Sequence, residues 1–159
     1  MLTSAADPEY IAPHCKKYED YDRVMDAGAS SKNIYFIRYA DLILLYAECL
    51  LAENDLAGAK QQVIRVRNRA KVSTPITASN NTEMLDFIYE ERMRELGMEG
   101  WRRMDLIRRG ADYFAAQVDK YNPFAKGNVQ PYHAFYPIPT NEINMNDGIG
   151  AEDQNEGYK

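Results

Sequence analysis

The strongest constraint on the fold is an apolar stretch at residues 37–51. Apolar side chains recur there at the three- and four-residue spacing of a helix, and leucines fill the neighbouring positions. These residues are Tyr39, Leu42, Ile43, Leu44, Leu45, Tyr46, Ala47, Leu50 and Leu51. Only a narrow stripe through Arg38, Asp41 and Glu48 is left for solvent, so the pattern predicts a core helix that other helices cover. The apolar run falls well short of the roughly 20 residues that cross a bilayer, and we expect no transmembrane segment.

A second helix is expected directly afterwards, at about residues 56–71. Its inner stripe recurs at steps of four, three and four residues and consists of Ala59, Val63, Val66 and Ala70. Because only the short turn at Asn54 and Asp55 separates the two helices, they should form an antiparallel hairpin. The small residues Ala47 and Ala59 lie where these helices would approach most closely. This pattern matches the inner part of one tetratricopeptide repeat, and a lone repeat cannot bury both of its faces.

A third helix is predicted at about residues 82–99, after a start at Asn80 and Glu83 that resembles a capping box. Arg92 falls inside the apolar stripe of this helix, so its charge should need a buried carboxylate partner. We expect a structural ion-pair network made of Arg92, Glu95, Glu99, Arg102 and Asp105. Arginines that alternate with the glutamates would keep them ionised, which is the wrong state for a general acid. No catalytic residue is therefore assigned.

The remainder of the chain is expected to be shorter helices followed by irregular structure. A short helix is predicted at residues 101–109 and another at residues 112–121. Residues 122–159 read as a mostly irregular tail, because Pro137 and Pro139 impose an extended segment. Residues 1–33 read as an irregular lead-in. Together these patterns predict one all-α domain over residues 1–159, with tetratricopeptide-like antiparallel helix pairs and a helical core at residues 34–121.

Charge and cysteine content exclude several classes of protein. The net charge is −5, and a basic middle section lies between acidic ends, which favours intramolecular ion pairing over nucleic-acid binding. Cys15 and Cys49 are too few for a disulfide framework and lack zinc spacing; Cys49 is expected to be a buried thiol. The sequence contains no phosphate-binding glycine loop, no Ser/His/Asp set and no metal cluster, so no metal or cofactor is expected.

Aromatic residues in the second half of the chain are the remaining ligand-binding candidates. Trp101, Phe135 and Tyr136 have apolar neighbours and are expected to pack in the core. Three others belong to a loop region with Gly127 and Asn128 and are weak candidates for ligand contact: Tyr121, Phe124 and Tyr132.

The chain resembles the C-terminal part of the SusD/RagB family through a set of short motifs in the correct order and spacing. They are Lys17-Tyr18 and residues 37–48, 66–70, 91–96, 99–102, 105–110, 136–139, 142–143 and 157–158. Departures are small: Gly97 replaces the usual alanine, and Arg103 stands at an aromatic position of the family. Members of this family are surface glycan-binding lipoproteins of Bacteroidetes nutrient-uptake systems.

This resemblance implies a non-enzymatic scaffold of a glycan-binding protein on the outer-membrane surface. Its partners would be an oligosaccharide and a SusC-like TonB-dependent transporter. Residues 1–14 contain no signal or lipid-attachment segment, and family members are several times longer, so the sequence is expected to be a C-terminal fragment with little glycan affinity of its own. The alternative is a cytoplasmic tetratricopeptide-type adaptor that binds peptide tails in a basic groove near Arg65 and Arg69.

Overall fold

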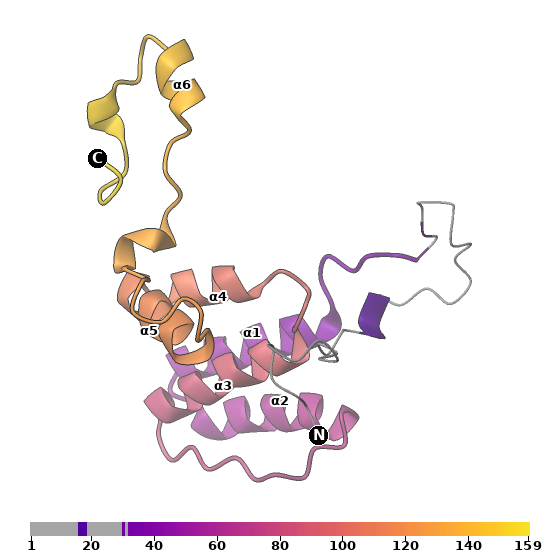
Figure 1. The fold of residues 1–159 in the computed structure, drawn as a ribbon. Helices are drawn as coiled ribbons and strands as arrows, with labels where there is room; N and C mark the ends of the chain where they lie inside the picture. The colour runs from indigo at the N-terminus through magenta and orange to yellow at the C-terminus, as the bar shows by residue number, and fades with distance from the viewer. Residues whose placement is uncertain (1–15, 19–29, 31) are drawn as a thin grey trace, which may run out of the picture.

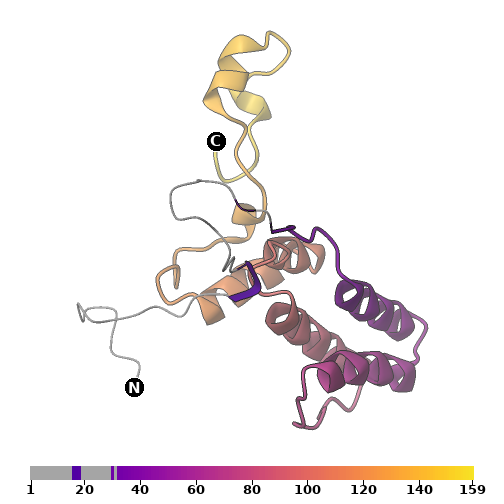
Figure 2. The ribbon, with the colours of Figure 1, turned by 90° about the vertical axis from the view of Figure 1, so that its right-hand side faces the viewer.

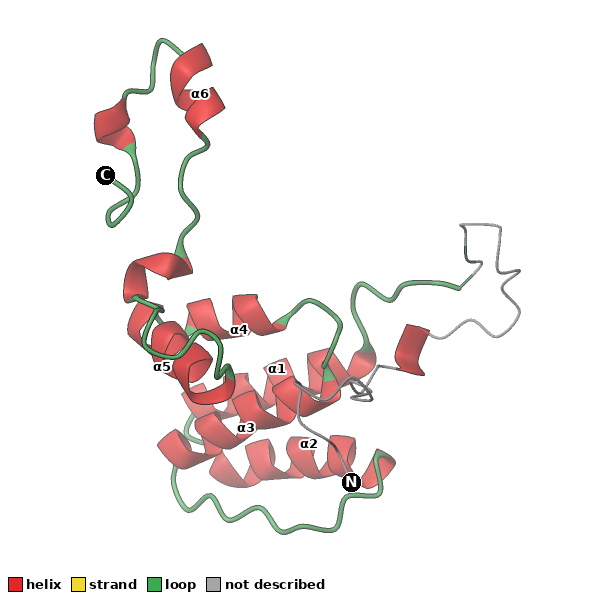
Figure 3. Cartoon of the chain, viewed as in Figure 1, coloured by secondary structure: helices red, strands yellow, loops and turns green. Residues whose placement is uncertain are grey.

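The computed structural model describes residues 16–18, 30 and 32–159, and the described residues are helical with no strand among them (Figure 1, Figure 3). The α-helices are α1 (Tyr39–Ala52), α2 (Leu56–Arg69), α3 (Asn81–Glu95), α4 (Arg102–Arg108), α5 (Ala111–Tyr121) and α6 (Thr140–Met145). Short 3-10 turns are η1 (Lys16–Tyr18), η2 (Pro131–Ala134) and η3 (Ala151–Asp153). The all-α prediction is confirmed. The expected lead-in lies mostly outside the described residues, as does Cys15, so the division into lead-in, core and tail stays a prediction.

Helices α1 and α2 form the predicted antiparallel hairpin, and α3 packs against both of them (Figure 2). Asp55 starts α2, because its side chain accepts a hydrogen bond from the Gly58 N–H at 2.8 Å. Asn80 starts α3 in the same way, with its side chain accepting from the Glu83 N–H at 3.0 Å. Helices α2 and α3 therefore begin close to the residues that local sequence signals indicate.

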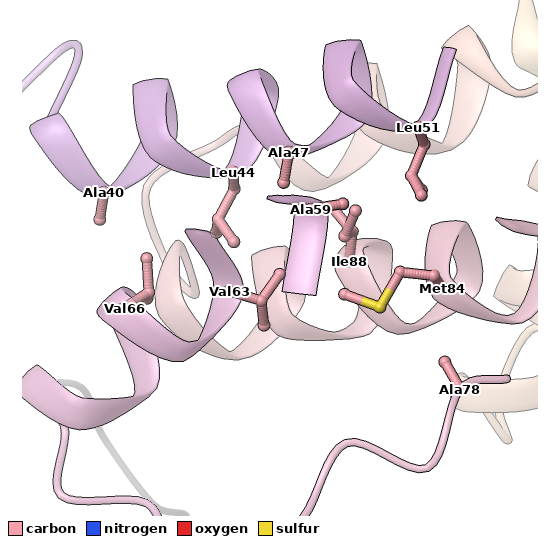
Figure 4. Close-up of a cluster of buried hydrophobic side chains, with 10 residues drawn as sticks. All are labelled: Ala40, Leu44, Ala47, Leu51, Ala59, Val63, Val66, Ala78, Met84 and Ile88. Atoms are coloured by element: carbon pink, nitrogen blue, oxygen red, sulfur yellow. The ribbon is translucent and has the colours of Figure 1, made fainter. Parts of the chain in front are cut away.

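The main core lies among these three helices (Figure 4). Ala47 of α1 and Ala59 of α2 are fully buried between their helices. The larger side chains of the core fill the space toward α3: Leu44, Leu51, Val63, Val66, Met84 and Ile88. Ala70, predicted on the inner stripe of α2, is exposed beyond the end of that helix.

The orientation of α1 differs from the prediction. Asp41 is buried and Glu48 is half-buried, whereas Tyr39, Leu42 and Tyr46 are more than half exposed. The expected solvent stripe thus faces the interior. The physical reason is that arginines of α3 and α4 hold these two carboxylates inside.

The same rotation makes the prediction for Cys49 wrong, because its thiol is exposed on the outer side of α1. Helix α3 is also shorter than predicted and ends at Glu95. Met98 and Gly100 both have positive φ angles, 65° and 85°, which are incompatible with a continuing α-helix.

A second, smaller cluster joins α4, α5 and η2 through Leu106, Phe114 and Ala134. Arg103 of α4 connects them, since its guanidinium donates to the carbonyls of His133 and Ala134 at 2.9 and 3.1 Å.

Residues 135–159 then leave the bundle as an arm that carries α6 and η3 and turns back toward its base (Figure 1, Figure 2). None of the helices in the described part of the chain is long and apolar enough to cross a membrane.

Candidate functional site

The most deeply buried charges form a cluster that joins α1, α3 and α4. Arg92 of α3 is 2% exposed and lies 2.7 Å from Asp41 Oδ1 and 2.9 Å from Asp105 Oδ1. Arg108 of α4 contacts Glu48 at 3.0 Å and Asp105 at 3.1 Å. We call these five side chains the central ion-pair cluster. It holds three helices together by charge as well as by apolar packing.

Two groups in and beside the central cluster, Arg92 and Tyr89, have raised pKa values. Burial acts to lower the pKa of Arg92, but its hydrogen bond and attraction to Asp105, with the pairing to Asp41, outweigh burial and raise that pKa overall. Tyr89 lies beside the cluster and its hydroxyl donates to Glu48 at 3.4 Å. Burial, together with the charge of Glu48, raises the pKa of Tyr89 to about 12. Both groups therefore stay protonated near neutral pH.

A second group of charges lies at the carboxyl end of α3. Arg38 donates to both Glu99 oxygens at 3.0 and 2.9 Å and to Glu95 Oε1 at 3.0 Å. Lys17 donates to Glu99 at 2.6 Å and to the carbonyls of Glu95 and Gly97 at 2.6 and 3.1 Å. Arg69 of α2 contacts Glu95 at 2.7 Å. We call these five side chains the α3-end cluster. Its cations also satisfy carbonyls that the helix end leaves unpaired.

Glu99 is the titratable group on which the α3-end cluster acts most clearly. Burial acts to raise the pKa of Glu99, but hydrogen bonds from Arg38 and Lys17, reinforced by their charges, lower it below its ordinary value. Glu99 is therefore an ionised carboxylate at neutral pH.

The predicted five-residue network divides between the two clusters. Arg92 and Asp105 belong to the central cluster, and Glu95 and Glu99 belong to the α3-end cluster. Arg102 differs from the prediction, because it donates to the backbone carbonyl of Tyr89 at 3.1 Å instead of to a carboxylate.

Six members of the two clusters were not predicted as such. Sequence reasoning missed two acidic residues and four basic ones: Asp41, Glu48, Lys17, Arg38, Arg69 and Arg108. A signal existed for the first pair: two carboxylates seven residues apart in an otherwise apolar helix can face one buried cation.

The three aromatic candidates do not come together in the structure. Tyr121 ends α5, and its hydroxyl donates to Glu90 at 3.3 Å. Phe124 lies in the following loop and is 88% exposed. Tyr132 belongs to η2 and stacks edge-on against Tyr158, with their ring centroids 5.1 Å apart. Tyr132 also lines a hollow.

The hollow beside Tyr132, which we call the arm hollow, lies between η2 and the returning end of the chain and has a volume of about 690 Å³. Phe135 lines it. Phe135 and Tyr136 are both exposed, so the prediction that they pack in the core is wrong. The reason is that the chain leaves the bundle at this point, and Tyr136 instead lies against Arg103, whose guanidinium carbon is 4.2 Å from the ring centroid.

Trp101 is half-buried, and its indole N–H donates to the Phe36 carbonyl at 3.2 Å.

Comparison with known proteins identifies the family. The sequence profile of the SusD family matches residues 2–158. The chain belongs to the SusD family. This agrees with the motifs, several of which supply the ion pairs: residues 37–48 provide Arg38, Asp41 and Glu48, and residues 91–96 provide Arg92 and Glu95.

Curated SusD-family relatives match most of this chain. "SusD-like protein P25" of Formosa agariphila is 34% identical over 134 residues, which covers 81% of this chain and 25% of the relative. "Starch-binding protein SusD" of Bacteroides thetaiotaomicron is 32% identical over 142 residues, covering 86% of this chain and 23% of the relative. The chain thus spans about a quarter of the length of these relatives. No solved structure matches it significantly. Family membership does not favour the adaptor alternative.

Proposed function

We propose that this chain is the helical scaffold portion of a SusD-type protein that binds a glycan without cleaving it. The observation that carries the proposal is the family match over nearly the whole chain, together with the similarity to a relative named for starch binding. The structure is consistent with a scaffold, because the buried polar groups join helices to one another. The unit that binds the glycan is the whole protein, of which this chain spans about a quarter by comparison with its relatives.

The pairing of the glutamates with cations supports the proposed absence of hydrolysis. Glycoside hydrolysis needs two carboxyl groups, one of which is protonated and can donate to the leaving oxygen. Glu91 contacts Arg67 at 2.9 Å, Glu95 contacts Arg38 and Arg69, and the pKa of Glu99 is lowered. A lowered pKa, as in Glu99, opposes the role of a general acid.

The proposal includes a location and a partner. A protein of this kind would be anchored at the outer-membrane surface and would pass oligosaccharide to a SusC-like TonB-dependent transporter. Detergent extraction of the native membrane followed by capture of the full-length protein should recover such a transporter in the same complex. Recovery of the protein in the cytoplasmic fraction alone would contradict both the proposed location and the proposed partner.

Binding without cleavage is tested on the full-length protein. Calorimetric titration against a panel of oligosaccharides should show saturable binding to at least one of them. Mass spectrometry of that oligosaccharide after long incubation should show unchanged chain length, with a glycoside hydrolase as the positive control. Shortened products would overturn the non-enzymatic proposal if a mock purification without the protein yields none, and their loss in Glu99→Gln protein would place the activity in this chain.

A further inference from the structure

The arm hollow is held in shape by hydrogen bonds that connect both of its walls. Gln154 is paired with the backbone of Ile138, accepting from its N–H at 2.7 Å and donating to its carbonyl at 2.9 Å. Asn155 donates to the Tyr136 carbonyl at 2.7 Å, and the Tyr158 hydroxyl donates to the Phe135 carbonyl at 3.1 Å. These bonds fix the end of the chain against η2 and leave the hollow between them.

The lining combines aromatic residues with hydrogen-bonding residues, of which one is acidic. Phe135 is 59% exposed at the rim, and Tyr132 forms part of the wall. Gln130 and Asn155 contribute carboxamides, and Glu156 contributes a carboxylate. A volume of about 690 Å³ lies within the usual range of small-molecule sites, which extends from about 300 to 1,000 Å³. Aromatic surface with a few polar groups suits a ring that is apolar on its faces and carries hydroxyls at its edge.

The charge of the lining selects among such ligands. No lysine, arginine or histidine is among the lining residues in the described part of the chain, and Glu156 forms no ion pair there. By contrast, the hollow beside the α3-end cluster, about 290 Å³, is lined by Lys17 and by Arg38, Arg69 and Arg94. A carboxylate with no neighbouring cation repels an acidic or sulfated sugar.

We infer that the arm hollow is a subsite for a neutral sugar unit. Phe135 supplies the stacking surface, Gln130 and Asn155 exchange hydrogen bonds with ring hydroxyls, and Glu156 accepts from a hydroxyl and excludes anionic sugars. The choice of a sugar as ligand rests on the proposed function. Because the hollow is open and shallow, binding should be weak, with dissociation constants on the order of millimolar.

The test is a titration of the isotopically labelled 159-residue chain, followed by amide chemical shifts. The neutral probes are maltotriose, cellotriose and xylotriose, and the anionic probe is trigalacturonic acid. At least one neutral probe should produce saturable shifts confined to the amides around Phe135 and at residues 155–157. Trigalacturonic acid should produce none at the same concentration.

Matched variants separate this hollow from other exposed aromatic surface. Phe135→Ala should weaken binding about fivefold or more, because the stacking face is lost. Phe124→Ala removes a more exposed phenylalanine outside the hollow and should change affinity less than about twofold. Glu156→Lys should weaken the discrimination between neutral and anionic sugars, so that trigalacturonic acid now produces shifts at the same amides. The undisturbed amide spectrum of the helical bundle shows that each variant is folded.

Each other outcome overturns the inference. The inference is wrong if no neutral probe produces a saturable shift, or if Phe135→Ala binds as well as the parent. It is also wrong if only Phe124→Ala loses binding, or if the parent binds the anionic probe more tightly than the neutral ones. These results are distinguishable from failure of the proposed function. If the full-length protein binds a glycan while the hollow shows no shifts, the subsite is wrong and the proposed function stands. If the hollow binds a neutral probe but the full-length protein hydrolyses glycan, the subsite stands and the proposed function is wrong.

Discussion

At Arg92, a guanidinium that is 2% exposed lies between carboxylates from two other helices. Burying a charge is tolerable only when charged partners replace its water shell. Asp41 and Asp105 do so here, and Arg108 supplies a second cation to Asp105. Removing Arg92 would leave two buried carboxylates close together with too few cations.

Arg92→Met should therefore be strongly destabilising. Loss of one member of a buried charged pair costs about 3 to 5 kcal/mol, which corresponds to a melting temperature lower by roughly 10 °C for a chain of this size. The matched control is Arg94→Met in the same helix, whose half-exposed side chain pairs with Glu90 and Glu91. An exposed pair contributes at most about 1 kcal/mol. Similar melting temperatures for the two variants, measured by calorimetry, would contradict this assignment.

At the level of elements, α1 has two apolar faces, and only one of them is covered by residues that the structure describes. Leu44 is fully buried against α2 and α3, whereas Leu42 is 52% exposed on the outer side. Both residues were included in the same predicted apolar helix. Their energetic contributions should differ because the hydrophobic effect depends on the area removed from water.

Leu44→Ala should lower the free energy of unfolding by about 2 to 5 kcal/mol through lost contacts and a cavity. Leu42→Ala changes a surface position and should stay within about 0.5 kcal/mol of the parent. Urea denaturation midpoints of the two variants check this prediction. A larger loss for Leu42→Ala would mean that α1 is rotated in solution.

The arm is a second element with its own local requirement. Gly157 has a φ angle of 87°, and a Cβ atom placed on it would lie 2.3 Å from Cγ of Tyr132. Such a distance is far inside van der Waals contact, so a side chain here must displace the end of the chain from the Tyr132 ring.

Gly157→Ala should therefore release the end of the arm without unfolding the bundle. The amide of Tyr158, which donates to the Asn155 carbonyl at 3.1 Å, should exchange its hydrogen faster in this variant. Gly148→Ala is the control in the same arm, since a Cβ there meets only the Asn146 side chain, at 3.3 Å. Unchanged Tyr158 exchange in Gly157→Ala would show that the arm does not close against η2.

For the whole molecule, the α3-end cluster couples stability to pH through Glu99. The pKa of Glu99 lies below its ordinary value of 4.5 in the folded chain. The folded state therefore binds this proton less readily than the unfolded state does. Its contribution to stability is complete above the ordinary pKa and is lost as the pH falls through the lowered one.

The melting temperature of the parent should exceed that of Glu99→Gln most clearly at pH 7, and the difference should shrink as the pH falls below about 4.5. Glu53→Gln, at an exposed position after α1, should follow the parent throughout. Melting curves recorded from pH 7 to pH 3 provide the check. A difference that does not change with pH would mean that Glu99 acts through its shape and not through its charge.

Several properties of this protein could be predicted from the sequence by itself. Helix positions follow from apolar spacing and from caps such as Asn80, because each depends on residues within one or two turns. The need for a carboxylate near Arg92 follows from its place in an apolar stripe. The family follows from ordered short motifs and is shown by the profile match.

Only the tertiary structure decided which face of α1 is buried and which aromatic residues line a hollow. The partner of Asp41 is Arg92, which lies 51 residues further along the chain, and apolar spacing within α1 carries no information about it. That partner turns Asp41 inward and leaves Leu42 and Cys49 outside. The arm hollow likewise depends on the chain returning from α6 to Phe135. Local periodicity determines helices, but long-range charge pairing and chain reversal determine which surfaces remain available for binding.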